Sequence, residues 1–279
     1  MIETIGSYRC FGGSQSFHRH PSNSIGSPMK FGVFRPDDCA SDAPALLFLA
    51  GLTCTEETFA MKAAAQRHAA ERGLVLVTPD TSPRDTGIDG AKKFWDFGEG
   101  AGFYLDATEA PWAERFRMET YVAEELVALL VDHFAVDRAR LSIFGHSMGG
   151  HGALTLALRH PGLFRSVSAL APICAPTTCA WGRKAFSRYL GEERTTWDAH
   201  DASALMSRAH RPYPEGILID QGLSDQFLEQ QLRPEAFEAA CAAAGQPLTL
   251  RRHAGYDHGF YFLSTFVADH ITFHADALR

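Results

Sequence analysis

Short runs of apolar residues alternate along the chain with longer segments of helix-favouring composition. The runs are apolar at nearly every position, as in Leu-Leu-Phe-Leu-Ala at 46–50, which is typical of strands covered on both faces. Two earlier segments, 7–11 and 30–34, are separated by a polar stretch and predict an antiparallel start to the sheet. The strands predicted after them cover residues 46–50, 74–77, 140–144, 166–170, 217–220 and 248–251.

The segments between these strands have the composition or the periodicity of helices. Alanine and other good helix formers fill residues 56–72. Residues 117–134 place apolar side chains on one face, namely Val122, Leu126, Leu129 and Leu130. Further helices are predicted over 152–158, over 229–244 and after His258. This alternation predicts an α/β-hydrolase fold, with a mostly parallel central sheet and helices on both faces.

Two segments interrupt the alternation. Residues 79–111 form a long, glycine-rich and aromatic stretch, and long loops of this kind are usually functional. Residues 171–215 contain four prolines and two tryptophans and predict a small, partly helical cap over the carboxyl edge of the sheet. No linker is visible, so we expect one domain over 1–279.

Composition narrows the class of protein. The chain has 279 residues, is 46% hydrophobic and carries a formal charge of −7. This negative charge does not indicate a basic surface for nucleic acid. Its start lacks a basic region followed by an apolar run, and no stretch approaches a spanning helix. We therefore expect a cytoplasmic protein with no membrane partner. Six scattered cysteines predict reduced thiols, and Cys174 and Cys179 lack a second pair that would complete a zinc site.

The strongest chemical signal is Gly145-His146-Ser147-Met148-Gly149, which follows a predicted strand and opens a predicted helix. This context is that of a nucleophile elbow, in which a serine stands on a tight turn between slim neighbours. Ser147 is the predicted nucleophile, and the N–H of Met148 is predicted to face the oxyanion. The alternative is an ordinary strand–turn–helix.

A serine nucleophile needs a base and an acid, which follow it in the order acid, then histidine, in this fold. Asp225, in the turn after the strand 217–220, is the predicted acid; a structural turn or helix cap is its alternative role, and Asp220 is its rival. His258, flanked by glycine after the last strand, is the predicted base. His253 lies too close to the strand end to reach Ser147 easily, and His270 and His274 lie within the final helix as surface or packing residues. His146 is assigned to packing beside Ser147, with a hydrogen-bonding role as the alternative.

The second oxyanion donor should come from the loop after the strand 46–50. The N–H of Leu52 is the best candidate there. Cys54, in the same loop, either lines the acyl pocket or is a small buried thiol.

Taken together, these motifs give the chain a resemblance to the S-formylglutathione hydrolases, also called esterase D. The matching segments are Gly51 to Glu56, Trp95 to Gly98, Gly100 to Tyr104, Gly145 to Leu154, Trp181 to Phe186, Asp220 to Gly222 with Asp225, and Gly255 to His258. The chain departs from the family pattern at Gly259, where a serine is usual, and at Ala180, where a proline is common.

The resemblance implies hydrolysis of S-formylglutathione to glutathione and formate, with side activity on short acyl esters. It also implies Ser147, Asp225 and His258 as the triad, no cofactor, a cytosolic location and often a homodimer. The rival functions are a general short-chain carboxylesterase or acyltransferase, and a non-catalytic binding protein.

Formyl is small, so bulky side chains are expected around it. Trp95, Phe97 and Trp181 are candidates for that wall, and a role in the core is the equal alternative. Glutathione carries two carboxylates, for which the insertion offers Arg183, Lys184 and Arg188 as contacts or as ordinary surface charges.

Overall fold

The computed structural model describes residues 1–209 and 211–279. Their strands form one sheet in the order β1-β2-β3-β5-β4-β6-β7-β8-β9. The pairs β1-β2, β2-β3 and β3-β5 are antiparallel, and the pairs from β5 to β9 are parallel. The strands are β1 (Glu3–Cys10), β2 (Gly13–Pro21), β3 (Pro28–Pro36), β4 (Ala43–Leu49), β5 (Val75–Pro79), β6 (Val136–His146), β7 (Val167–Leu170), β8 (Ile217–Gly222) and β9 (Leu248–His253).

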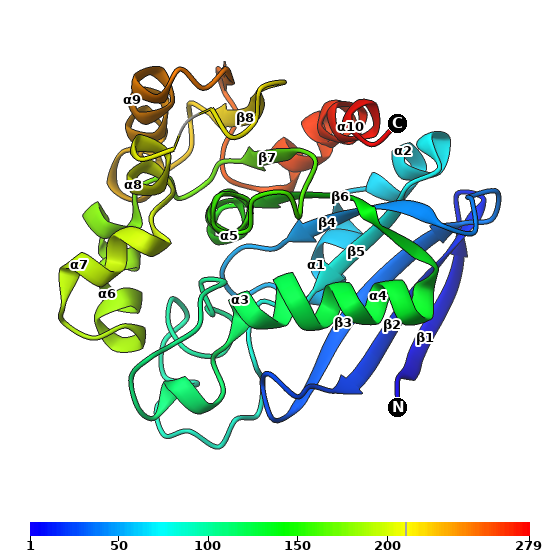
Figure 1. The fold of residues 1–279 in the computed structure, drawn as a ribbon, viewed down its shortest axis with the longest axis horizontal. Coiled ribbons are helices and arrows are strands. Elements are labelled where there is room, and N and C mark those ends of the chain that lie inside the picture. Colours follow the sequence, from blue (N-terminus) through cyan, green and yellow to red (C-terminus); the bar gives the residue numbers. More distant parts are fainter. Residues whose placement is uncertain (210) are drawn as a thin grey trace.

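Helices cover both faces of this sheet, as the sequence predicted. Helices α2 and α10 lie side by side on one face, and α4 and α5 lie on the other (Figure 1). The helices are α1 (Glu56–Lys62), α2 (Ala65–Arg72), α3 (Met118–Thr120), α4 (Val127–Phe134), α5 (Met148–Arg159), α6 (Ala180–Tyr189), α7 (Arg194–Trp197), α8 (Ala202–Ser207), α9 (Pro234–Ala244) and α10 (Phe260–Ala277). No helix in the described ranges is both long enough and apolar enough to cross a bilayer.

The polar stretch near the start of the chain is a strand, which corrects the prediction of a separating segment. β2 pairs with β1 on one side and with β3 on the other. Its histidines are buried: His18 stacks on Phe31 at 5.2 Å, and His20 stacks on Tyr121 at 5.8 Å between ring centroids. Imidazole rings therefore take the inward positions that apolar side chains usually occupy.

Two predicted helices are each divided by a residue in the left-handed region. Ala64, with φ of 54°, separates α1 from α2. Arg233, with φ of 53°, separates a π-helical turn over Leu228–Leu232 from α9. The first break turns the chain so that α1 begins at the loop after β4 while α2 packs against α10.

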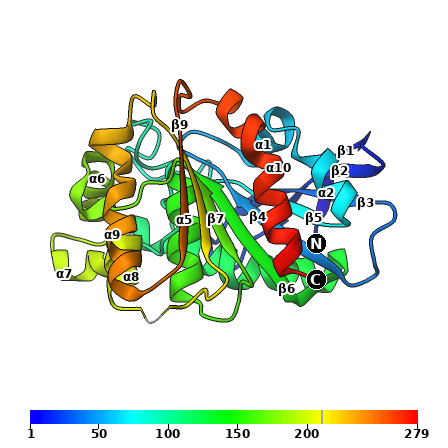
Figure 2. The ribbon, with the colours of Figure 1, turned by 90° about the horizontal axis from the view of Figure 1, so that it is seen from above.

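The insertion between β7 and β8 contains α6, α7 and α8. These helices gather with α9 at one end of the sheet, in both views (Figures 1 and 2). The long segment after β5 contains only isolated bridges, such as Phe94 with Phe97, before a short 3₁₀ turn at Trp112–Glu114.

A buried polar network joins α10 to the sheet. His274 contacts Ser166 Oγ through Nδ1 and Ser168 Oγ through Nε2, each at 2.7 Å. His270 contacts Ser168 Oγ at 2.7 Å and the carboxylate of Asp220 at 3.1 Å. Both histidines are fully buried, and burial lowers the pKa of each ring. Neutral imidazoles therefore fix the helix to β7 and β8.

Candidate active site

Ser147 lies on the turn between β6 and α5, with φ of 58° and ψ of −120°. A Cβ at Gly145 would lie 2.1 Å from the Gly149 carbonyl oxygen, and a Cβ at Gly149 would lie 1.9 Å from the Leu49 oxygen. Only glycine fits at both positions. The N–H of Ser147 donates to Leu170 O at 3.0 Å, which ties the turn to the end of β7. The structure therefore has the strained turn expected of a nucleophile elbow.

His258 and Asp225 meet at the same edge of the sheet. His258 Nδ1 donates to Asp225 Oδ2 at 2.5 Å, and Asp225 Oδ1 accepts from Phe227 N at 2.8 Å. The His258 ring lies 4.5 Å from the ring of His146, the residue before Ser147. The hydrogen bonds of the described residues include none between Ser147 Oγ and His258, and such bonds often tighten only when substrate binds.

Asp220, the rival acid, is surrounded by other partners. It accepts from Arg251 Nε and Nη2 at 2.6 and 2.5 Å, from His253 Nε2 at 2.9 Å and from His270. Burial alone would raise the pKa of Asp220, but these hydrogen bonds lower it below the ordinary value. Its carboxylate supports the end of the sheet and does not contact His258.

Gln221 is a site residue that the sequence reasoning missed. Its buried side chain donates through Nε2 to Asp225 Oδ2 at 3.3 Å and to Gly222 O at 3.0 Å. The amide therefore holds the same carboxylate oxygen that His258 contacts. A polar side chain in a strand covered on both faces is the signal that could have identified it.

His146 packs directly behind the proposed base. Its ring is buried, and burial together with repulsion from His258 lowers the pKa of His146 well below the usual value. Its Nε2 has no hydrogen-bond partner among the described residues. A neutral ring that packs on His258 agrees with the packing role predicted for it.

The loop after β4 lies against the nucleophile. A Cβ at Gly51 would lie 3.2 Å from the Cβ of Ser147. The N–H of Thr53 donates to Gly100 O at 2.8 Å and that of Cys54 donates to Gly51 O at 3.2 Å. The bonds of the described residues include none from the N–H of Leu52, while Met148 begins α5, where an N–H has no intrahelical partner. Both amides can therefore donate to an oxyanion.

Two side chains after β5 hold this loop in place. The Cys54 carbonyl accepts from Thr81 Oγ1 at 2.7 Å and from Arg84 Nη2 at 2.8 Å. Arg84 is in turn held by the buried Asp80, with Nη2 to Oδ1 at 2.6 Å. The Cys54 thiol itself is partly buried, and burial raises its pKa, so it is protonated at neutral pH.

A row of aromatic side chains leads away from His258. Phe227 lies 5.1 Å from His258, Trp181 lies 4.8 Å from Phe227, and Trp95 lies 5.4 Å from Trp181. Phe227 was not among the predicted pocket residues, although it follows closely on Asp225. Trp95 is 55% exposed.

Phe97 has a different setting from Trp95. It is 1% exposed and packs on Trp112 at 4.7 Å and on Tyr189 at 4.6 Å. Of the two roles predicted for Phe97, this placement favours the core over the pocket wall. The order of residues alone could not separate the two roles, because both use large aromatic side chains.

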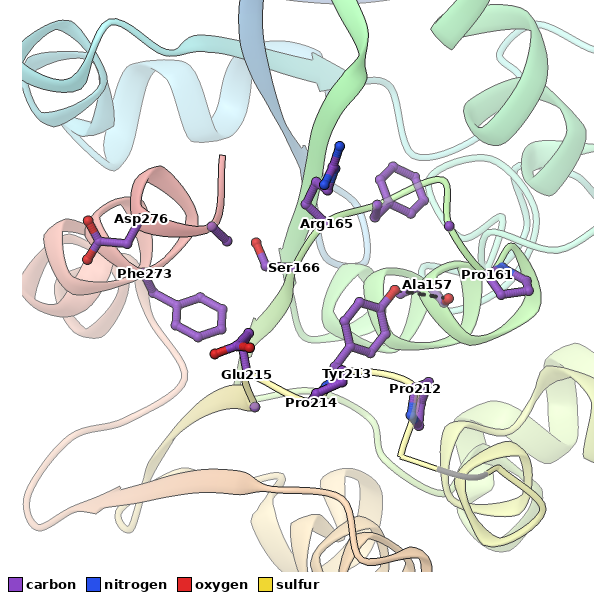
Figure 3. A pocket seen from close by; sticks show the side chains of 14 residues that line it. Ala157, Pro161, Arg165, Ser166, Pro212, Tyr213, Pro214, Glu215, Phe273 and Asp276 are labelled. Carbon is purple, nitrogen blue, oxygen red and sulfur yellow. Dashed lines mark hydrogen bonds between the residues drawn. The ribbon is translucent and has the colours of Figure 1, made fainter. Parts of the chain in front are cut away.

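One pocket lies near the carboxyl ends of the strands and another lies near their amino ends. One of about 420 Å³ is lined by Ser224, Gln226, Phe227, Asp257, His258 and Gly259. A larger one of about 770 Å³ lies where β7 and β8 begin, between α5, α10 and the segment around Tyr213 (Figure 3). Ligands in parallel α/β sheets bind at the carboxyl ends of the strands, which favours the smaller pocket. The described residues include no group of three or more side chains arranged to hold a metal ion.

Comparison with known proteins gives consistent relatives over the whole chain. A family profile described as "Putative esterase" matches residues 22–273. The S-formylglutathione hydrolase of Mus musculus is 51% identical over 280 residues, covering 100% of this chain and 99% of the mouse protein. That of Paracoccus denitrificans is 50% identical, covering 99% and 98%. The solved S-formylglutathione hydrolase of Agrobacterium tumefaciens superposes with a TM-score of 0.96 at 47% identity, covering 99% of each chain.

Proposed function

This chain belongs to the S-formylglutathione hydrolase family of esterases, and we propose that Ser147, Asp225 and His258 are its catalytic triad. It is a serine hydrolase that cleaves thioesters. Its proposed substrate is S-formylglutathione, cleaved to glutathione and formate. The observation that carries the assignment is 51% identity, over the full chain, to a protein of that activity.

In the first half of the proposed reaction, His258 removes the proton of Ser147 Oγ as that oxygen attacks the formyl carbon. The negative charge that develops on the carbonyl oxygen is stabilised by the N–H groups of Leu52 and Met148. Loss of one such donor typically costs about 3 kcal/mol of barrier. Asp225 keeps the His258 ring oriented and stabilises its positive charge.

The carbon–sulfur bond then breaks, and the glutathione sulfur takes the proton from His258 as it leaves, so that the imidazole is neutral again. A thiol with a pKa of roughly 8.5 is a good leaving group and needs little help from an acid. Water, deprotonated by His258, next attacks the formyl ester of Ser147. Formate leaves, and Ser147 Oγ recovers its proton.

The test compares steady-state hydrolysis of S-formylglutathione and of p-nitrophenyl acetate by the native protein and by Ser147→Ala. We expect a large preference for the thioester and loss of both activities in the variant. Ser207→Ala, which changes an exposed serine of α8, is the matched control and should retain both. Equal or better turnover of the simple ester would overturn the substrate and leave a general short-chain esterase.

Two further properties belong to this proposal. The six cysteines are free thiols, which supports a reducing, cytoplasmic location. A homodimer is also expected from the family. An apolar groove that includes the exposed Tyr8, Phe11 and Met61 offers a face for it, and light scattering of the purified protein would measure the assembly.

A further inference from the structure

Glutathione is a tripeptide thiol with two carboxylates, so a selective enzyme should offer it a cation near the reacting sulfur. We infer that Lys62, at the end of α1, binds one of these carboxylates. This inference rests on the proposed function and adds to it a subsite for the thiol half of the substrate. The lysines and arginines around the site differ in the residues they contact, and this difference supports the inference.

The cations on the insertion side are already engaged. Lys184 forms an ion pair with Asp96 and lies 4.0 Å from the ring centroid of Phe94. The Arg188 guanidinium lies 4.8 Å from the rings of both Phe94 and Phe97. The ammonium of Lys184 is therefore neutralised by an acid of the protein, and the Arg188 guanidinium is held against two rings.

Arg183 and Arg84 have structural partners as well. Arg183 Nε donates to Thr177 O at 3.1 Å. Arg84 donates hydrogen bonds to Asp80 and to the carbonyl of Cys54. The second bond holds the loop after β4 that contains Leu52, called the oxyanion loop below. The contact with glutathione considered for Lys184 from the sequence is therefore disfavoured. The rings that Arg188 contacts, Phe94 and Phe97, are not among those that pack on His258.

Lys62 differs from Arg84 and Lys184, which are paired with acids. It is exposed and forms no ion pair with an acid among the described residues. Its Nζ lies 5.3 Å from the ring centroid of Phe260, a contact that holds an ammonium in place without neutralising it. The charge is thus positioned and still available to an anion.

The position of Lys62 fits the direction that the leaving thiol must take. The sulfur has to lie beside His258, which can return a proton to it. Phe260 follows His258 closely in sequence, and its ring lies 6.3 Å from that of His146, which packs on His258. An extended tripeptide spans about 10 Å, so a carboxylate of glutathione can reach past Phe260 to Lys62.

The electrostatics of the oxyanion loop agree with this placement. The ammonium of Lys62 is among the charges that oppose the rise in the pKa of the Cys54 thiol. Its field therefore extends to the loop beside Ser147. A cation there also favours approach of an anionic substrate.

The test uses Lys62→Met and the matched control Lys93→Met, which removes an exposed lysine next to Phe94. Each is assayed with S-formylglutathione and with the formyl thioester of N-acetylcysteamine, which has no carboxylate. We expect Lys62→Met to lower the ratio of the two kcat/KM values about 5- to 20-fold, mainly through KM. Lys62→Arg should restore most of the ratio, and 0.5 M salt should reduce the difference because salt screens exposed charges.

A second measurement does not depend on turnover of the thioester. S-methylglutathione should inhibit hydrolysis of p-nitrophenyl acetate competitively, and its inhibition constant should rise by a similar factor in Lys62→Met and stay constant in Lys93→Met. An unchanged constant and ratio in Lys62→Met, or a change only in Lys93→Met, would overturn the subsite. If the native protein bound S-methylglutathione but did not hydrolyse S-formylglutathione, the proposed function would fail, and the inhibition constants would still decide the role of Lys62.

Discussion

The Oδ2 atom of Asp225 accepts a hydrogen bond from Nδ1 of His258 at 2.5 Å, while Asp220, on the preceding strand, bonds to Arg251, His253 and His270. The two carboxylates lie close in sequence and have separate partners. They are therefore expected to have separable roles in activity and in stability.

Substitution of these two acids by asparagine should separate the roles. Asp225→Asn should lower kcat by about 10⁴-fold with the fold intact, because the histidine loses its orienting charge. Asp220→Asn should reduce the free energy of unfolding by roughly 3 to 5 kcal/mol, since it leaves buried partners unpaired, with a much smaller change in kcat. Urea denaturation and steady-state kinetics measure both. A reversed pattern would assign the triad acid to Asp220.

Gln221 should act through Asp225 as a positioning residue. A hydrogen bond to a charged group contributes about 1.5 to 3 kcal/mol, so Gln221→Leu should lower kcat about 10- to 100-fold with little change in KM. Gln246→Leu removes another buried glutamine, bonded to Tyr213 O and Pro247 O, and should affect stability alone. Equal effects on kcat from both variants would make the role of Gln221 merely structural.

Trp95 and Phe97 should respond differently to alanine substitution. Phe97→Ala should cost about 3 to 5 kcal/mol of stability, as for a buried aromatic side chain. Trp95→Ala should change stability by less than about 0.5 kcal/mol and shift the preference between p-nitrophenyl acetate and hexanoate roughly ten-fold. Thermal unfolding measures the two stability changes, and kcat/KM for the two esters measures the acyl preference. An unchanged preference in Trp95→Ala would show that Trp95 does not line the acyl pocket.

Gly259, next to the proposed base His258, precedes α10 and supplies no side-chain cap. Its φ of −84° suits any residue, so Gly259→Ala should stabilise the protein by about 0.4 to 1 kcal/mol through the unfolded state. Gly259→Ser should add a few tenths from capping. A Cβ here would lie 3.2 Å from Asp257 Oδ1, which must shift slightly. A lower melting temperature in both variants would show that the Asp257 carboxylate does not shift to admit the new Cβ.

Buried neutral histidines should make stability depend on pH. Burial lowers the pKa of His151 from 6.5 to about 4. Between these values the unfolded chain binds a proton here that the folded chain does not. Stability should therefore fall as the pH is lowered, by up to about 1.4 kcal/mol per pH unit for this residue. His151→Gln keeps a donor for Phe103 O and should weaken the dependence.

The control for this effect is His133→Gln, at an exposed position of α4. Urea denaturation between pH 7.5 and 4.5 should give the same slope for this variant as for the native protein. If His151→Gln also kept the native slope, the ring would have to be protonated in the folded state.

The strands β4 to β8 and the α/β-hydrolase fold could be predicted because apolar runs are a local signal. Their order in the sheet could not be read from these runs. The triad follows from the elbow at Ser147 by the chain order of acid and base, and it stays a prediction. β2 could not be predicted in this way, since Ser14, Gln15, Ser16 and the two histidines after Phe17 carry no apolar alternation. It is buried through ring stacking with partners distant in sequence.

The breaks at Ala64 and Arg233 gave no signal for a related reason. Both residues adopt the left-handed backbone conformation, in which glycine or asparagine is usually found. Alanine is the best helix former, so the composition of 56–72 predicts one helix. Tertiary packing decides the turn here. The same limit applied to Phe97 and Gln221, whose roles depend on neighbours contributed by other parts of the chain.

The attachment of α10 by His270 and His274 has a consequence for the newly made chain. Ser147 and Asp225 are synthesised well before this helix, which follows all the strands of the sheet. Until α10 emerges from the ribosome, Ser166 and Ser168 lack their imidazole partners and one sheet face lacks its cover. A nascent chain that already contains Ser147, Asp225 and His258 is therefore expected to be inactive until its last helix docks.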